Sequence, residues 1–204
     1  MKLPRILSKV SKNLIWNFRE EEKKIYLTFD DGPTEELTDW ILETLERYHA
    51  KATFFCLGKN AARFKNQYQK ILHAGHAVGN HSYSHLKGWS KKNLKYFRDI
   101  EQAGELIHSN LFRPPHGRIG FSQIKHLKTD YKIIMWDVLS IDYNPNYKPE
   151  KIIQRVIRLS RPGSIVVFHD SNSAEKNLKE VLPVILNYFQ NKGYTFSSIP
   201  YKQN

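Results

Sequence analysis

The sequence predicts an α/β protein in which parallel strands and helices alternate to form a barrel. Short runs of β-branched and aromatic residues alternate with segments whose apolar residues recur at helical spacing, the pattern of successive βα units. Functional groups at the carboxyl ends of the strands are typical of (β/α) barrels. No glycine-rich dinucleotide fingerprint is present, so a Rossmann fold is not supported. Polar residues follow strand after strand: Asp30, His81, Arg113, Asp142 and His169.

The first half of the chain contains three predicted strands separated by helices. We expect strands over residues 25–29, 52–57 and 76–80. Apolar periodicity predicts helices over residues 37–50, with Thr34 as the N-cap, and over residues 62–72, ended by Gly75. Ser90 is expected to cap the next helix. The apolar face of that helix is predicted to contain Leu94, Phe97, Gly104 and Ile107.

The second half repeats this alternation. We expect strands over residues 131–136, 164–168 and 194–199, and helices over residues 124–127, 149–159 and 178–190. Pro149 suits the first turn of its helix. Pro183 lies inside the last helical pattern, so a late start or a kink is expected there.

Length and composition indicate one soluble globular domain. The chain has 204 residues, of which 40% are hydrophobic and 25% charged, enough to bury a core without disulfides. The single cysteine, Cys56, lies in a predicted buried strand and has no partner for an intramolecular disulfide. The net charge of +12 favours anionic partners. Because the lysines are spread over helices and no nucleic-acid motif is present, no nucleic-acid partner is expected.

Residues 1–23 are predicted to form a helical N-terminal extension, followed by the main domain over residues 24–204. Helical spacing of apolar residues, with lysines between them, favours a helix that packs on the domain. A basic amphipathic helix at a membrane surface is the alternative. The sequence shows neither an export signal nor a spanning segment, so a cytoplasmic or membrane-peripheral location is expected. The apolar residues are Ile6, Leu7, Val10, Leu14 and Phe18.

Two adjacent carboxylates and two histidines four residues apart are the residues that indicate the chemistry of the protein. Asp30 and Asp31 follow a predicted strand, where a polar turn is the simplest interpretation, but two neighbouring carboxylates repel unless one has a cation or a proton. His81 and His85 are four residues apart, which on a helical turn lets both imidazoles share one metal ion. With Asp31 they form a ligand set that also suits non-haem Fe(II) oxygenases. The additional acid–base groups at residues 30, 113 and 169 favour hydrolysis.

Five ordered segments resemble the motifs of the polysaccharide deacetylases, also called NodB-homology or carbohydrate esterase family 4 domains. The resemblance covers about residues 24–200. It implies a distorted (β/α) barrel with about seven parallel strands, fewer than the eight of the regular type. It also implies removal of N-acetyl, sometimes O-acetyl, groups from sugars with a divalent metal, usually Zn²⁺, with Co²⁺, Mn²⁺ or Ni²⁺ as alternatives. The segments are Thr28–Gly32, His81–His85, Arg113–Gly117, Ser140–Tyr143 and Val167–Asp170.

The resemblance also assigns roles to individual residues. It implies metal ligation by Asp31, His81 and His85. It implies Asp30 as general base held by Arg113, and His169 as general acid oriented by Asp142. The backbone N–H near His116 is implied to bind the oxyanion. The implied substrate-binding residues are Pro115, His116, Tyr143 and Val167.

Three positions depart from the usual family pattern. Tyr143 stands where Trp is typical, Val167 where Leu is frequent, and His116 where Tyr is commoner. The first two usually line the pocket for the acetyl methyl group, so we expect a roomier pocket and a looser preference for acetyl over larger acyl groups. Little change in the chemistry is expected from His116, because the role at that position is mainly a backbone one.

We therefore expect a metal-dependent hydrolase that removes N-acetyl groups from an amino-sugar glycan or oligosaccharide, such as peptidoglycan or chitin oligomers. One alternative is a metal-dependent amidohydrolase that acts on a non-sugar amide. Another is an inactive glycan-binding module, which the presence of both Asp30 and His169 disfavours.

Overall fold

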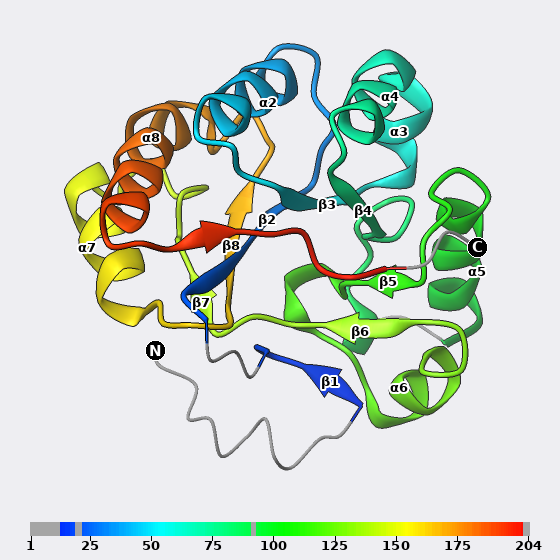
Figure 1. Cartoon of the computed structure of the whole chain (residues 1–204). Helices are drawn as coiled ribbons and strands as arrows, with labels where there is room; N and C mark the ends of the chain where they lie inside the picture. The colour runs from blue at the N-terminus through cyan, green and yellow to red at the C-terminus, as the bar shows by residue number, and fades with distance from the viewer. Residues whose placement is uncertain (1–12, 19–21, 91–92, 202–204) are drawn as a thin grey trace.

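The computed structural model describes residues 13–18, 22–90 and 93–201, in which helices lie around the outside of one curled parallel sheet (Figure 1). Among these residues the sheet has nine strands in the order β1-β6-β5-β4-β3-β2-β8-β7, with β9 paired to β2. The paired strands all run parallel. The strands are β1 Leu14–Ile15, β2 Lys24–Asp30, β3 Ala52–Cys56, β4 Ala77–Asn80, β5 Leu111–Phe112, β6 Lys132–Ile134, β7 Val138–Leu139, β8 Ser164–His169 and β9 Thr195–Phe196.

The helices follow the strands as a (β/α) barrel requires. The α-helices are α2 Leu37–Arg47, α3 Gly58–Arg63, α4 Lys65–His73, α5 Asn93–Gly104, α6 Phe121–Leu127, α7 Pro149–Leu159 and α8 Glu175–Asn191, and two 3₁₀ turns are η1 Gly88–Ser90 and η2 Pro115–Gly117. Because β1 and β7 end the strand order without pairing to each other, the barrel is distorted, as predicted. No described helix is long and apolar enough to cross a bilayer.

The central strands are buried on both faces, which explains their nearly continuous apolar sequences. Phe29 of β2 stacks between Phe54 of β3 and Phe168 of β8, with ring centroids 5.1 and 5.9 Å away. These three side chains are at most 1% exposed. Their packing fixes β2 and β8, whose last residues are Asp30 and His169, against β3.

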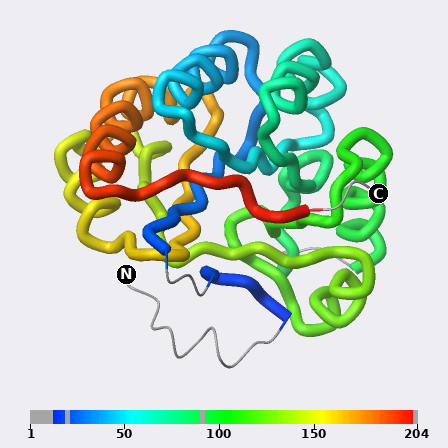
Figure 2. The backbone as a smooth tube through the Cα atoms, viewed as in Figure 1, coloured from blue at the N-terminus to red at the C-terminus, as the bar shows by residue number. Residues whose placement is uncertain are grey.

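The C-terminal segment crosses the amino ends of the strands (Figure 2). Strand β9 pairs with the first residues of β2, and the backbone N–H of Ile199 donates to Oγ1 of Thr53 near the start of β3 (2.8 Å). This end of the barrel is therefore covered by the chain itself. The carboxyl ends of the strands, where the polar residues lie, are at the opposite end of the barrel.

The helix predicted near the N-terminus is not found in its described part. Leu14 and Ile15 form strand β1, which pairs with Ile133 and Ile134 of β6, while residues 1–12 lie outside the described residues. Phe18 packs against Tyr26 with ring centroids 4.5 Å apart. Leu14 and Ile15 thus form the edge strand of the sheet, next to β6. This pairing favours a strand at these residues, although the spacing of the apolar residues predicts a helix.

Several helix details also differ from the sequence expectation. Residues 62–72 belong to two helices, α3 and α4, separated at Phe64. Helix α8 starts at Glu175 and continues through Pro183, and its residues before and after the proline pack into the core. Thr34 does not cap α2; its hydroxyl donates instead to Asp170. The buried face of α5 is Tyr96, Ile100 and Ala103, a better-spaced stripe than the predicted one, and Leu94 is 62% exposed.

Candidate active site

Strand register brings the first catalytic candidates together. In the parallel pair β2–β8, Asp30 lies opposite His169 and Thr28 lies opposite Val167. Side chains two residues apart share one face of a strand, so Thr28 and Asp30 point to the same side. The last residues of β2 and β8 therefore present a carboxylate and an imidazole side by side at the carboxyl end of the sheet.

Asp30 is held by a fully buried arginine. Nη1 of Arg113 donates to Oδ1 of Asp30 (2.6 Å) and to Oγ1 of Thr28 (2.7 Å). The same guanidinium donates to the carbonyls of Ile134 and Met135, which fixes its plane. Burial alone would raise the pKa of Asp30, but the charges of Arg113, His81 and His169 lower it overall. Asp30 is therefore an ionised carboxylate near neutral pH.

Three candidate metal ligands converge on one oxygen. Oδ1 of Asp31 lies 3.6 Å from Nε2 of His81 and 3.3 Å from Nε2 of His85. One ligand atom from each of the three residues lies within 4.8 Å of the other two. The spacing of the two histidines predicts a helical turn, and this prediction is wrong. Residues 81–87 are irregular, and His85 has a φ of 64°.

This cluster has the features of a metal site. Oδ1 of Asp31 is buried and accepts no hydrogen bond, which is costly unless a cation faces it. Nδ1 of His81 donates to the carbonyl of Arg113 (2.8 Å), leaving Nε2 with a free lone pair. Burial lowers the pKa of both His81 and His85 to about 4, so both rings are neutral and suited to ligation.

His169 is paired with a buried carboxylate. Its Nδ1 lies 2.8 Å from Oδ1 of Asp142, and its backbone N–H donates to Oδ2 of the same residue (2.8 Å). Burial lowers the pKa of His169, but the charge and hydrogen bond of Asp142, helped by Asp30 and Asp31, raise it to about 9. His169 is thus a protonated imidazolium at neutral pH, close to an ionised Asp30.

A pocket of about 360 Å³ collects most of the predicted residues. Arg113 and Asp142 do not line the pocket, but they bind Asp30 and His169, which do. Pro115 is buried within η2 and does not line the pocket either. The ring of Tyr143 stands edge-on to His169, with centroids 4.8 Å apart. The lining consists of Asp30, Asp31, His81, His85, His116, Trp136, Leu139, Tyr143, Val167, His169 and Ser173.

Sequence reasoning missed three lining residues, Trp136, Leu139 and Ser173. Trp136 ends the strand predicted over residues 131–136, but β6 ends at Ile134 and Trp136 lines the pocket. Leu139 belongs to the unpredicted strand β7, whose two residues are too few for a sequence pattern. Only its place before a motif residue, Ser140, offered a signal.

Asp170 was also missed, although it ends one of the five motifs. It is fully buried and accepts hydrogen bonds from the hydroxyls of Thr34 (2.7 Å) and Thr38 (2.5 Å). A Cβ on Gly32 would lie 2.2 Å from its Oδ2, so only glycine fits there. Asp170 therefore fastens the turn that carries Asp31 to the end of β8.

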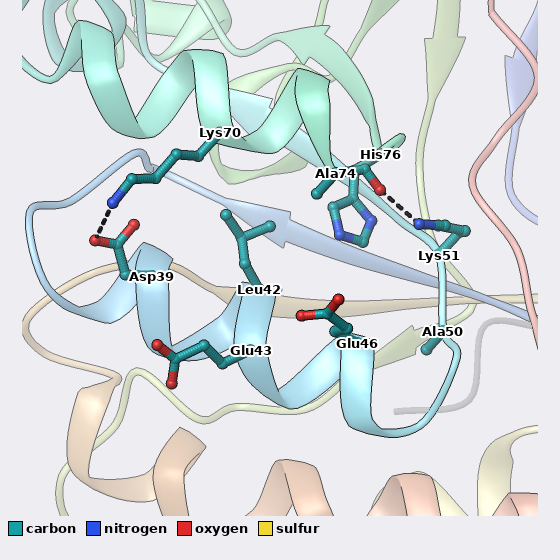
Figure 3. Close-up of a pocket in the computed structure, with 9 residues that line it drawn as sticks. All are labelled: Asp39, Leu42, Glu43, Glu46, Ala50, Lys51, Lys70, Ala74 and His76. Carbon is teal, nitrogen blue, oxygen red and sulfur yellow. Dashed lines mark hydrogen bonds and ion pairs between the residues drawn. The ribbon is translucent and has the colours of Figure 1, made fainter.

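A second hollow lies away from these residues, between α2 and α4 (Figure 3). Its volume is about 250 Å³. Across it Lys70 pairs with Asp39 (2.7 Å), and Nδ1 of His76 accepts the backbone N–H of Ala52 (3.1 Å). Burial and the charge of Lys51 lower the pKa of His76 to about 4. These contacts are internal to the packing of helices on the sheet, and we assign the hollow no chemistry.

Comparison with known proteins shows the family of the chain. A polysaccharide deacetylase family model matches residues 18–129. The chain is 32% identical over 185 residues to a peptidoglycan-N-acetylglucosamine deacetylase of Bacillus cereus, covering 87% of this chain and 67% of that protein.

Solved structures share the whole fold. A peptidoglycan N-acetylglucosamine deacetylase in complex with 4-naphthalen-1-yl-N-oxidanyl-benzamide matches with a TM-score of 0.89 and 28% identity, covering 98% of this chain and 96% of that one. A carbohydrate esterase family 4 pseudoenzyme from Bacillus anthracis matches with a TM-score of 0.81 and 26% identity, covering 95% and 69% of the two chains. This chain belongs to the polysaccharide deacetylase family.

Proposed function

We propose that this chain is a metal-dependent hydrolase that removes N-acetyl groups from an amino-sugar glycan of the peptidoglycan kind. One observation carries the proposal: three residues able to hold a metal, an ionised carboxylate and a protonated imidazole line one pocket. Each of the two acid–base groups has its own buried partner, Arg113 for Asp30 and Asp142 for His169. Hydrolysis of an amide needs such a base and such an acid on the same substrate.

Asp31, His81 and His85 would hold the metal. The donor set of two imidazoles and one carboxylate suits Zn²⁺, and leaves positions open for water and substrate. A bound Zn²⁺ would supply Lewis acidity that activates water and polarises the acetyl carbonyl. Co²⁺, Mn²⁺ and Ni²⁺ are the alternatives.

Asp30 acts as the general base toward the attacking water. Its carboxylate lines the pocket, and Oδ2 lies 4.0 Å from Nε2 of His81, beside the proposed ligands. Arg113 occupies the other oxygen, Oδ1, so Oδ2 is the atom that accepts the proton. The backbone N–H of His116, on the opposite loop, is the proposed donor to the oxygen that becomes negatively charged.

His169 acts as the general acid toward the leaving amine. An amine anion is a poor leaving group, so its nitrogen must gain a proton as the C–N bond breaks. Asp142 holds Nδ1 of His169, which turns Nε2 as the proton donor toward the pocket. Tyr143, Val167 and Leu139 would surround the acetyl methyl group, and the smaller Val167 leaves room for a larger acyl group.

The fold alone does not decide activity, since one structural relative is described as a pseudoenzyme. The test is acetate release from N-acetylglucosamine oligomers and peptidoglycan fragments by protein that is metal-loaded, chelated, and reloaded. We expect release that disappears on chelation and returns with Zn²⁺. Absence of release from every sugar by metal-loaded protein would contradict the proposal and favour a non-sugar amide as substrate.

Replacing His85 with Ala should lower the affinity for Zn²⁺ by more than about 100-fold, because even changes outside the ligand set typically cost 10–100-fold. Isothermal titration of metal-free protein measures this without any substrate. His73→Ala is the matched control, since His73 ends α4 and lies outside the pocket. Equal affinities of the two variants would exclude His85 as a ligand.

The pH dependence should follow His169. Its acid form exists below a pKa of about 9, so kcat/KM is expected to fall as pH rises through about 9. The variant Asp142→Asn removes the charge that raises this pKa, so the alkaline limb should move to lower pH. NMR titration of the His169 ring in metal-free protein and the pH profile of kcat/KM should shift together. If the alkaline limb does not move in Asp142→Asn, His169 is not the general acid.

A further inference from the structure

Two neighbouring loops meet at the pocket and again beyond it. They follow β4 and β5, and contribute His85 and His116, whose ring centroids are 4.4 Å apart. Further along the same loops, the guanidinium carbon of Arg118 lies 5.9 Å from the ring centroid of Trp89. Arg118 follows His116 by two residues, a chain distance of at most roughly 7 Å. Trp89 and Arg118, which we call the outer rim, therefore adjoin the pocket.

The outer rim is held in place by contacts beneath it. Nε2 of Gln123 donates to the carbonyl of Gly88 (2.9 Å), while its Oε1 accepts the backbone N–H of Gly120 (2.9 Å). A Cβ on Gly88 would lie 2.6 Å from the carbonyl oxygen of Arg118. The backbones of the two loops are thus in contact, and these contacts hold the backbone next to Trp89 in place.

The outer rim combines an exposed aromatic face with positive charge. Trp89 is 69% exposed, unusual for the residue with the largest apolar surface. Arg118 is exposed beside it, as is Lys87 on the Trp89 loop. A ligand that matches this surface has a flat apolar face and an anionic group.

We propose that the outer rim is a subsite for a carboxylate-bearing sugar next to the acetylated sugar in the glycan chain. This inference rests on the proposed function, and it names the class of glycan preferred. The C–H face of a pyranose ring packs on the indole of Trp89. A carboxylate on that sugar accepts hydrogen bonds from Arg118, whose planar guanidinium suits carboxylate geometry. The net charge of +12 attracts such a chain.

The experiment compares two tetrasaccharides on the metal-loaded enzyme. One is the neutral N-acetylglucosamine tetramer, and the other is a peptide-free peptidoglycan tetrasaccharide whose alternate sugars carry a carboxylate. Arg118→Gln should lower kcat/KM about 10-fold on the carboxylated substrate, through KM, and leave the neutral one unchanged. Trp89→Ala should lower kcat/KM roughly 2–10-fold on both, because both sugars stack.

Matched controls are Arg158→Gln on α7 and Tyr188→Ala on α8, which change an exposed cation and a partly exposed aromatic side chain away from the pocket. Equal effects of Arg118→Gln on both substrates, or none, overturn the proposal. So does a Trp89→Ala variant that loses binding to phosphatidylserine vesicles but keeps both KM values, since the rim is then a membrane contact. Should the wild type release no acetate, the proposed function fails separately. Titration of both tetrasaccharides into wild type and Arg118→Gln then decides the subsite.

Discussion

Replacing Asp30 with Asn should reduce kcat by about 10²–10⁴-fold, the usual contribution of a general base. The amide keeps the shape of the side chain and still accepts a hydrogen bond from Arg113 through its oxygen. It has no charge with which to take a proton from water. KM and metal affinity should change little, because Asp31, His81 and His85, not Asp30, are the proposed ligands. Loss of kcat with intact metal binding is therefore the expected signature.

Acetate release under saturating substrate gives kcat, and titration of metal-free protein gives the affinity for Zn²⁺. Asp39→Asn is the matched control, because Asp39 is a carboxylate on α2 in the hollow away from the pocket. It should retain wild-type kcat. A variant Asp30→Asn with activity near that of the wild type would remove Asp30 from the mechanism. A large loss of Zn²⁺ affinity would instead make Asp30 part of the metal site.

The strand-end residues were predictable because parallel strands bring their carboxyl ends to one edge. Asp30 and His169 are separated by 139 positions in the sequence, yet they are register partners on β2 and β8. Alternation of strands and helices was enough to predict that they meet. The assignment of partners, Arg113 to Asp30 and Asp142 to His169, came from the family resemblance, and the observed distances of 2.6 and 2.8 Å agree with it.

The loop that carries both histidines was not predictable from its own residues. Its shape depends on Asp99 of α5, whose Oδ2 accepts the backbone N–H groups of Tyr83 and Ser84 (both 3.1 Å), and on Asn80, whose Oδ1 accepts that of Ser82 (2.8 Å). Such side-chain hydrogen bonds compete with the helix that the spacing suggests. The contacts with Asp99, 15 and 16 residues away along the chain, leave no periodic pattern in the sequence.

Backbone strain marks the same region. Six described non-glycine residues have a positive φ, and five of them lie in or next to the site, including the β-branched Ile141 at 71°. Local preferences disfavour these conformations, so surrounding contacts must impose them. Sequence reasoning from propensity therefore fails most where the functional side chains are aimed. The five are Asp31, Ser82, His85, His116 and Ile141.

Replacing Arg113 with Met should destabilise the metal-free protein by about 3–5 kcal/mol, the cost of breaking a buried ion pair by removing one partner. Arg113 is fully buried, and its guanidinium also packs over the ring of Phe55 at 4.1 Å. Met fills similar volume but leaves Asp30 without a cation, and Thr28, Ile134 and Met135 without a donor. The melting temperature should fall by about 2–4 °C for each kcal/mol in a chain of this length.

The double variant Arg113→Met/Asp30→Asn separates the charge effect from packing. It removes the unpaired carboxylate, so its free energy of unfolding should recover part of the loss seen in Arg113→Met. Urea unfolding of the wild type, both single variants and the double variant gives the coupling energy. Arg158→Met, on the exposed face of α7, is the matched control and should stay within about 0.5 kcal/mol of the wild type. If the double variant is as unstable as Arg113→Met, the carboxylate is not what Arg113 stabilises. The guanidinium would then serve the backbone carbonyls at the end of β6, and Asp30 would be ionised for another reason.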